Sequence, residues 1–203
     1  MIDYFAELGS AGDPVADVRR FYQAADRLDT LAHVTGVAKA AVDLAVQYGA
    51  DCATANLAAL AHDLAAVVPE DEMPAVAVSM GLRLGEVDWV FRMLLHGPIA
   101  AAALVAKLDV CDRDLLNAVR YHSTLRAGAS TLEKIVFVAD KIAYDPTAPH
   151  RGAYMPTLRA ARSLDDKALA YLDFLLDNGW RYGWLLHPNA VAAYRELTGR
   201  VTR

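Results

Sequence analysis

The spacing of apolar residues is the feature that most constrains this chain. Between sequence breakers, apolar side chains recur at every third or fourth position, and each such stretch is long enough for several helical turns. A half-buried strand would instead show apolar and polar residues in strict alternation. We therefore predict an all-α protein.

Composition limits the kinds of partner this chain can have. Its 203 residues, 55% of them apolar, suffice for the core of one domain, and a second full domain is not expected. The net charge of -5 argues against a nucleic-acid partner. We find no signal peptide and no apolar stretch near the roughly 18 residues that a membrane helix needs. With Cys52 and Cys111 far apart, we expect a soluble cytoplasmic protein.

Start and stop signals give the expected helix boundaries. Thr30 is a candidate N-cap for a long helix, and a further helix is expected over about 54–68. Another is expected over about 86–96, ending at a Gly-Pro break. Ser130 and Glu133 form a capping box, which is a strong start signal.

Several polar residues lie where a helical core expects apolar side chains, or at expected helix ends. A lone histidine on an apolar helix is more often a hydrogen-bonded core residue than a ligand, and a buried carboxylate needs a partner. Four histidines and two aspartates from five helices together indicate a site for one or two transition metals, because imidazole and carboxylate both bind such ions. The set consists of His33, His62, Asp63, His96, His122 and Asp140.

The order and surroundings of these residues resemble those of the HD-domain metal-dependent phosphohydrolases. Five sequence motifs around these residues are similar to motifs of the YqeK group. They are AHVTGVAKAAVDLAVQYGAD, LAHDLA, LLHGPIAA, NAVRYHSTLRAG and STLEKIVFVADKI. Members of that group are described as symmetrical diadenosine tetraphosphate hydrolases that release two ADP and bind a two-iron centre. The resemblance implies an HD-domain helical bundle with a C-terminal helical extension.

We expect a single domain over residues 1–203. Its HD core is expected over about 21–143, followed by a loop over 144–156 and C-terminal helices over about 157–198.

The resemblance also implies a role for each candidate ligand. The ligands of one metal match His33, His62, Asp63 and Asp140, and those of the second match His96 and His122. Asp63 matches the carboxylate that bridges the two ions. The implied cofactors are two divalent transition metals, iron by likeness to the group, with Mn, Co or Zn also compatible with these ligands.

A pair of such ions lowers the pKa of a bound water toward roughly 7. The expected reaction is attack of a metal-bound hydroxide on a phosphoanhydride or phosphoester bond of a nucleotide. Among nucleotides we expect a dinucleoside polyphosphate such as diadenosine tetraphosphate. His62 and Asp63 are the expected catalytic residues.

Three departures from the sequence motifs of the YqeK group alter the residues expected around the substrate. Thr30 stands where the group usually has arginine, although Arg27 lies one turn earlier. Leu125 takes the position of a glycine in the word that begins at the last histidine ligand. Lys141 and Ala143 replace a tyrosine and a glutamate.

The polyphosphate also needs cations beyond the metals. The cations closest in sequence to the motifs that contain the ligands are Lys141, Arg126 and Arg151, and Arg27 is a fourth candidate. Each is equally compatible with a solvated surface charge. His150, in a proline-rich stretch, is expected at the surface.

Aromatic residues crowd the stretch NGWRYGWLLHPNA near the C-terminus. The aromatic residues in it are Trp180, Tyr182 and Trp184, and we expect them to serve helix packing or a homodimer surface rather than base stacking. The alternative is that this stretch forms one wall of a nucleotide pocket.

Two other functions are compatible with the motifs. One is a non-catalytic nucleotide- or signal-binding module with structural metals, suggested by the altered substrate shell. The other is a di-iron oxygenase, since some members of the wider superfamily use these ligands for oxygen chemistry. A phosphohydrolase acting on a small nucleotide is the leading hypothesis.

Overall fold

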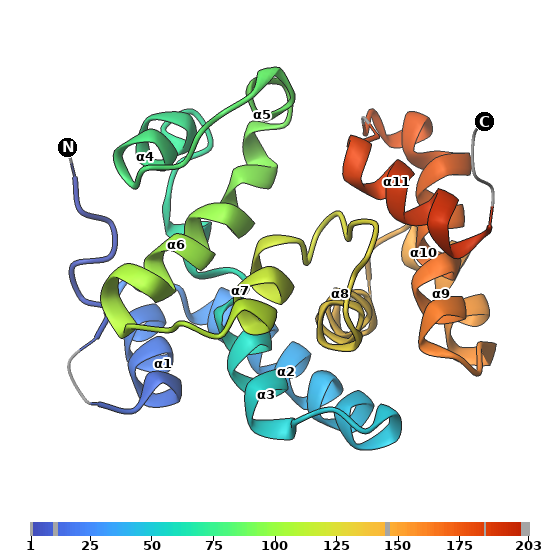
Figure 1. The fold of residues 1–203 in the computed structure, drawn as a ribbon, viewed down its shortest axis with the longest axis horizontal. Coiled ribbons are helices and arrows are strands. Elements are labelled where there is room, and N and C mark those ends of the chain that lie inside the picture. The colour runs from blue at the N-terminus through green and yellow to red at the C-terminus, as the bar shows by residue number, and fades with distance from the viewer. Residues whose placement is uncertain (1, 10–11, 145–146, 185, 200–203) are drawn as a thin grey trace.

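The computed structural model describes residues 2–9, 12–144, 147–184 and 186–199, and the regular elements within them are all helical (Figure 1). The α-helices are α1 (Pro14–Ala24), α2 (Leu28–Tyr48), α3 (Cys52–Ala61), α4 (Met73–Ser79), α5 (Glu86–Val90), α6 (His96–Leu108), α7 (Arg113–Arg120), α8 (Thr131–Ala143), α9 (Arg151–Ala160), α10 (Leu164–Asn178) and α11 (Pro188–Leu197). Short 3-10 helices are η1 (Leu64–Val67), η2 (Arg92–Leu95) and η3 (Gly179–Tyr182). The predicted all-α fold is confirmed.

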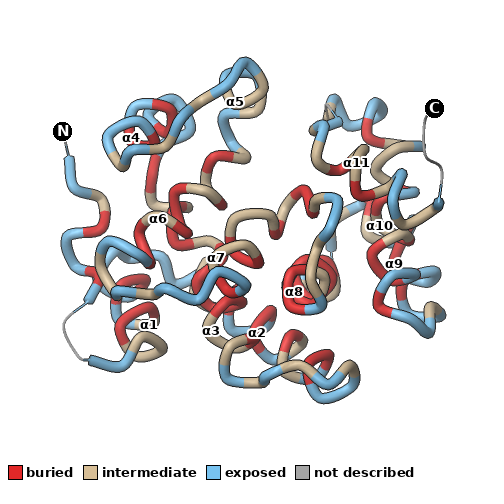
Figure 2. The backbone as a smooth tube through the Cα atoms, viewed as in Figure 1, coloured by how far each residue is buried: buried red, intermediate tan, exposed pale blue. Residues whose placement is uncertain are grey.

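Helix α8 lies at the centre of the fold (Figure 1). It packs against α2, α3 and α7, and also against α10. Nearly all of its residues from Leu132 to Lys141 are buried, so α8 is coloured as buried over most of its visible length (Figure 2). A surface helix keeps one polar face in water. The two-sided packing of α8 therefore holds polar residues such as Asp140 in the interior.

The start of α8 is fixed by the predicted capping box. Ser130 Oγ accepts a hydrogen bond from the backbone N–H of Glu133 at 3.1 Å, and Glu133 Oε1 accepts one from the backbone N–H of Ser130 at 3.2 Å. Such reciprocal bonds satisfy two donors that a helix start leaves free. The cap sets where α8 begins and thus where its later residues point.

The C-terminal helices α9, α10 and α11 form the group on the right of Figure 1. Within this group α10 packs against both α9 and α11, and α10 also joins the group to α8. Among the helices that the structure describes, none is both long and apolar enough to cross a bilayer.

Two expected helix boundaries near the N-terminal half were wrong. Helix α2 begins at Leu28 and not after a Thr30 cap, because Asp26 adopts a left-handed φ of 53° that turns the chain at once after α1. The helix expected over about 54–68 breaks after Ala61, since Asp63 leaves the helical conformation with φ -104° and ψ 19°. The apolar pattern continues across this break, which explains the error.

The helix expected over about 86–96 is also interrupted. Helix α5 ends at Val90, the 3-10 helix η2 follows, and His96 begins α6 where the sequence suggested that it ended a helix. Pro98 lies in the first turn of α6, where a missing N–H costs no helical hydrogen bond. The Gly-Pro pair thus belongs to a helix start.

The second part of the loop expected over 144–156 is helical and belongs to α9. Residues 145–146 lie outside the described residues, but Arg151–Ala160 are helical despite Pro156 in the helix interior. Tyr154, Met155 and Leu158 are buried on this helix. Their burial outweighs the cost of an interior proline, which we estimate at ~3 kcal/mol.

Candidate metal centre

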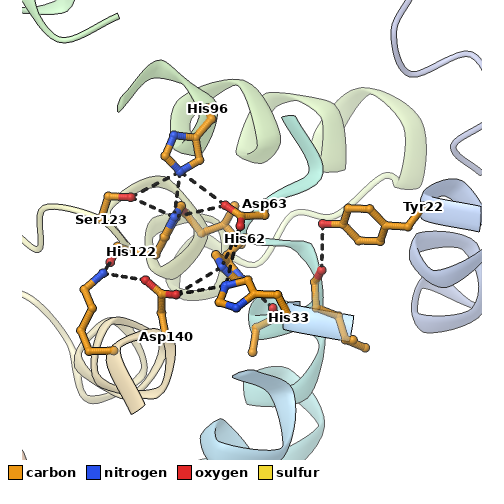
Figure 3. Close-up of polar contacts among 12 residues, drawn as sticks. Tyr22, His33, His62, Asp63, His96, His122, Ser123 and Asp140 are labelled. Atoms are coloured by element: carbon orange, nitrogen blue, oxygen red, sulfur yellow. Dashed lines mark hydrogen bonds and ion pairs between the residues drawn. The ribbon is translucent and has the colours of Figure 1, made fainter. Parts of the chain in front are cut away.

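The six candidate ligands, distant in sequence, meet at one place in the fold (Figure 3). One comes from α2, two from the break between α3 and η1, one from the start of α6, one from just after α7 and one from α8. They are His33, His62, Asp63, His96, His122 and Asp140.

Asp63 stands between two pairs of histidines. Its Oδ2 lies 3.8 Å from His33 Nε2 and 3.4 Å from His62 Nε2. Its Oδ1 lies 3.5 Å from His96 Nε2 and 3.7 Å from His122 Nε2. A single carboxylate thus offers one oxygen to each pair, which is the arrangement of a bridging ligand.

Asp140 completes the first of these groups. Its Oδ1 lies 3.2 Å from His33 Nε2 and 3.8 Å from His62 Nε2. In two sets of three residues, the nearest ligand atoms all lie within 4.8 Å of one another. One set is His33, His62 and Asp140, and the other is His62, Asp63 and His122. Both groups are thus compact enough to hold an ion.

Backbone contacts orient three of the four imidazoles. In His62, His96 and His122, Nδ1 bonds the carbonyl oxygen of the residue three positions earlier, at 2.7, 2.5 and 2.8 Å. A carbonyl oxygen can only accept, so Nδ1–H is the donor and Nε2 is left facing the cluster as the atom that could bind an ion. A hydrogen bond of this kind, from the ring nitrogen that does not bind the ion, fixes the tautomer of a metal-binding histidine.

Two features of the cluster fit a cation. His62 Nε2 is buried and has no hydrogen-bond partner among the described residues. His96 Nε2 and His122 Nε2 lie 2.9 Å apart, although both are acceptors once their Nδ1 atoms donate. The Ser123 hydroxyl lies 2.9 Å from His122 Nε2 and 3.3 Å from His96 Nε2, and it has only one proton to donate. A bound cation satisfies these lone pairs together.

The close approach of α6 and α7 explains the proximity of His96 and His122. A Cβ atom at Gly97 would lie 2.6 Å from the carbonyl oxygen of Arg120, which is closer than real Cβ contacts permit. Only glycine allows the two backbones to meet here. The glycine of the Gly-Pro pair at the start of α6 therefore has a direct role in the site.

Electrostatics keep the carboxylate of Asp63 charged. Burial alone would raise its pKa, but His62, His96 and His122 hold that pKa far below its usual range. Burial alone would lower the pKa of His62, but Asp63 and Asp140 outweigh it and raise that pKa to about 9. Burial, reinforced by the neighbouring histidines, keeps the pKa of His122 well below its usual value. Asp63 and Asp140 thus make the cluster negative enough to favour positive charge beside them, as the raised pKa of His62 shows.

Lys141 is the only one of the four predicted substrate-binding cations that lines the cleft at the cluster. It is buried, its Nζ lies 2.6 Å from Asp140 Oδ2, and it lies over the rings of Phe137 and Tyr171 at 5.0 and 5.1 Å. Burial opposes the charge of each partner in this pair, yet the pair lowers the pKa of Asp140 and raises that of Lys141. Lys141 therefore already has a carboxylate partner.

The structure does not bring the three predicted arginines to the cleft. Arg126 forms a two-pronged ion pair with Glu133 at 2.6 and 2.7 Å. Arg151 donates to the carbonyl oxygen of Ile142 at 2.7 Å, and Arg27 is the exposed cap residue of α2. Their nearness in sequence to the motifs that contain the ligands reflects helix capping and surface packing.

The cleft above the cluster is larger than the ligand set and has a volume of about 650 Å³. One side comes from α5 and η2, including Phe91 and the exposed Arg92. Another side comes from the C-terminal part of the chain, including His150 just before α9 and Trp184 just after η3. Arg92 was not among the cations predicted from the sequence. Its position four residues before His96 is the sequence signal that could have identified it.

The expectation for His150 was wrong. Its exposed fraction is only 9%, and its ring lies 4.9 Å from that of Trp184 and 6.0 Å from that of Phe174. His150 does lie in the expected loop, as the last residue before α9, but its ring lines the cleft.

Leu125 stands where the motif of the YqeK group has glycine, and the structure shows how the backbone accommodates it. It has a left-handed φ of 57°, a conformation that favours glycine, and its side chain is 1% exposed. Left-handed backbone costs a non-glycine residue about 1–2 kcal/mol, and burial of a leucine side chain contributes a similar amount. The turn after His122 therefore persists without the glycine.

Comparisons with known proteins agree with this geometry. The model of the HD domain family matches residues 30–145, which is more than half of the chain. A solved structure of a predicted HD superfamily hydrolase involved in NAD metabolism from Clostridium acetobutylicum is similar, with a TM-score of 0.83 and 29% identity. The match covers 92% of this chain and 97% of that one.

Curated relatives carry a more specific name. A protein of Halalkalibacterium halodurans named symmetrical bis(5'-nucleosyl)-tetraphosphatase is 32% identical over 167 residues, which is 81% of this chain and 87% of that protein. A protein of the same name from Bacillus subtilis is 36% identical over 110 residues, which is 54% of this chain and 59% of that protein.

Proposed function

This chain belongs to the HD domain family, and from that premise we propose that it is a metal-dependent phosphohydrolase that cleaves a dinucleoside polyphosphate, diadenosine tetraphosphate above all. The observation that carries the proposal is Asp63, whose two oxygens each face a separate pair of histidines. The names of the curated relatives support the same substrate.

We assign two divalent transition-metal ions to the cluster, with iron first and Mn, Co or Zn as alternatives. The unpartnered Nε2 of His62 and the two facing acceptors of His96 and His122 support a cation on each side of Asp63. When bound, such a pair supplies Lewis-acid activation of water and neutralises phosphoryl charge.

The side chains of this protein do the positioning. His62, His96 and His122 keep their Nε2 lone pairs on the cluster because backbone carbonyls hold their Nδ1 protons. Asp140 keeps Oδ1 on the cluster because Lys141 holds Oδ2. These contacts fix the ligand side chains before substrate arrives, so no free energy is needed to orient them during the reaction.

The polyphosphate lies in the cleft next to the metal cluster. The exposed Arg92 on one wall and the buried Lys141 ammonium, which is paired with Asp140, provide positive charge. The oxygen of one water adds to an inner phosphorus, the central P–O–P bond breaks, and the products are two ADP. The proton released from the water passes to solvent.

The test uses metal content and product analysis on the same samples. We compare the wild type with Asp63→Ala and with Asp43→Ala, an exposed aspartate on α2, across a panel of nucleotides and dinucleoside polyphosphates. The proposal expects about two metals per chain, cleavage of diadenosine tetraphosphate to two ADP, and loss of both in Asp63→Ala alone.

Each alternative outcome contradicts a different part of the proposal. Bound metal without turnover of any compound supports a non-catalytic binding module. Products of AMP and ATP exclude symmetrical cleavage. Oxygen consumption with an iron-loaded sample supports an oxygenase.

The proposal places the reaction in the cytoplasm, in keeping with the free thiols of Cys52 and Cys111. A homodimer stays a prediction, to be tested by the mass of the protein in solution.

A further inference from the structure

The cleft has two chemically different ends. At the metal cluster it is lined by charged groups, including Asp63, Asp140 and Lys141. At the other end it is lined by aromatic rings from the segments that precede and connect the C-terminal helices, including Tyr144, His150 and Trp184. With the assigned cations at the metal cluster, a ligand that fills the cleft would be anionic at that end and flat and apolar at the other, which describes a nucleoside polyphosphate.

The aromatic end is built from rings that support one another. The His150 ring contacts Trp184 at 4.9 Å in a perpendicular arrangement, Tyr144 at 5.4 Å and Tyr182 at 5.5 Å. It also stacks on Phe174 at 6.0 Å. Burial lowers the pKa of His150, so the ring packs here as a neutral aromatic. Side chains held this way lose little rotamer freedom on binding.

A turn in the backbone explains why Trp184 faces inward while Trp180 does not. Gly183 has a left-handed φ of 70° that ends η3, and the backbone N–H of Trp184 donates to the carbonyl oxygen of Gly179 at 2.9 Å. Trp184 consequently lines the cleft and is half-buried. Trp180, in contrast, is 71% exposed and does not line the cleft.

A continuous series of contacts connects the two ends. Lys141, paired with Asp140, lies over the ring of Tyr171 at 5.1 Å. The ring of Tyr171 meets that of Tyr154 at 5.0 Å, and Tyr154 stacks on His150 at 6.5 Å. The aromatic end therefore has a fixed position relative to the carboxylate at the metal cluster.

We propose that Trp184, with Tyr144 and His150, forms a nucleobase-binding subsite that holds one base of the substrate while its phosphates reach the metal cluster. This inference rests on the proposed function for the identity of the substrate. The subsite itself is tested separately, because a nucleoside diphosphate binds to it without being cleaved. Stacking on an aromatic face tolerates different bases, so purines of either kind are expected to bind.

The experiment measures binding of ADP and of pyrophosphate to the metal-loaded protein by titration calorimetry. Trp184→Leu is compared with its matched control, Trp180→Leu, which changes a tryptophan in the same segment outside the cleft. Because one base–aromatic stack is worth about tenfold to a hundredfold in affinity, Trp184→Leu is expected to weaken ADP binding by about that factor. Pyrophosphate binding should change less than about twofold, since pyrophosphate has no base.

Other results overturn the subsite. Equal weakening of ADP and pyrophosphate by Trp184→Leu means that the substitution disturbs the metal end, and no change in either means that no base stacks there. Tyr144→Leu is the second variant, because Tyr144 is 40% exposed and its removal leaves the core intact. It should weaken ADP binding selectively as well, and failure to do so contradicts the proposal even if Trp184→Leu does not fold.

The outcome is distinguishable from a failure of the proposed function. If the wild type cleaves no dinucleoside polyphosphate but ADP binding still depends on Trp184, the subsite stands and the reaction is wrong. If diadenosine tetraphosphate is cleaved with an unchanged KM in Trp184→Leu, the reaction stands and the subsite is wrong.

Discussion

The two ends of the cleft are held in place by different forces. At the metal cluster, each imidazole of His62, His96 and His122 is oriented by a carbonyl oxygen within its own turn of backbone. At the aromatic end, the rings of His150 and Trp184 are held by other rings from distant segments. Local hydrogen bonds therefore set the geometry of the first end, and shape and buried area set that of the second.

This difference has an experimental consequence. Changes at the cluster should alter charge balance and metal binding and therefore stability. Changes at the aromatic end should affect packing and base binding while the metals stay bound. The predictions below test this separation, beginning with the largest expected effect.

The first prediction removes the buried ammonium beside the cluster. Lys141→Met leaves Asp140 buried without its ion-pair partner, and we expect the free energy of unfolding of the metal-free protein to fall by about 3–5 kcal/mol. The matched control is Lys134→Met on the same helix, whose ion pair with Asp165 at 2.7 Å is at the surface. It should cost less than about 1 kcal/mol.

Urea denaturation with and without metal measures both variants. Bound metal neutralises the carboxylate of Asp140, so the loss in Lys141→Met should be smaller in the metal-loaded protein. Equal losses in Lys141→Met and Lys134→Met would mean that the buried pair does not stabilise the fold.

The second prediction separates the two halves of the cluster. A methyl group at Gly97 would meet the carbonyl oxygen of Arg120 at 2.6 Å, so Gly97→Ala should push α6 away from α7 and separate His96 from His122. We expect a loss of stability of about 1–3 kcal/mol. Elemental analysis should show one of the two assigned metals lost and the other retained.

The control for this change is another helical glycine. Gly152 in α9 has no atom within 4 Å of the position that a Cβ would take. Gly152→Ala should therefore keep the metal content and leave stability unchanged or raise it by up to about 1 kcal/mol. Full metal content in Gly97→Ala would show that the close backbone contact is not needed at the site.

Most of the cluster was predictable from sequence because its signals are local. His33 and Asp140 stood out as polar residues on apolar helical stripes, and that pattern depends only on helical periodicity. The structure brings these residues together with the other four, while their function as ligands stays a prediction. The exact helix breaks at Asp63 and His96 were missed, because the apolar pattern continues through both of them.

The aromatic end was not predictable in the same way. Whether Trp184 or Trp180 faces the cleft depends on a single left-handed glycine at position 183 and on the packing of α10 against α8. Neither leaves a periodic trace in the sequence. The same holds for His150, because its burial depends on contacts with rings from distant segments, such as Trp184 and Phe174.

The third prediction tests the link between the two ends. Tyr154 donates a hydrogen bond from its hydroxyl to the carbonyl oxygen of Lys141 at 3.2 Å, in a buried position. Tyr154→Phe keeps the ring and should cost about 1 kcal/mol of stability. The hydroxyl of the neighbouring Tyr171 makes no hydrogen bond within the described part of the chain, so Tyr171→Phe should cost less than about 0.5 kcal/mol. Denaturation midpoints of the two variants measure the difference.

The last and smallest effect concerns pH. Burial lowers the pKa of His150 below its ordinary value of 6.5, so the folded protein takes up a proton there less readily than the unfolded chain does. The contribution of His150 to stability must therefore rise with pH through this range and fall as the pH drops below about 6.5. His150→Phe keeps an aromatic ring and removes the titrating group, so its stability should fall less with acid than that of the wild type when both are metal-loaded. Tyr154→Phe changes a neighbouring ring and should keep the wild-type slope. Parallel curves for the wild type and His150→Phe would mean that the ring at this position is as accessible to protons as in the unfolded chain, and the aromatic end of the cleft would then be open to water.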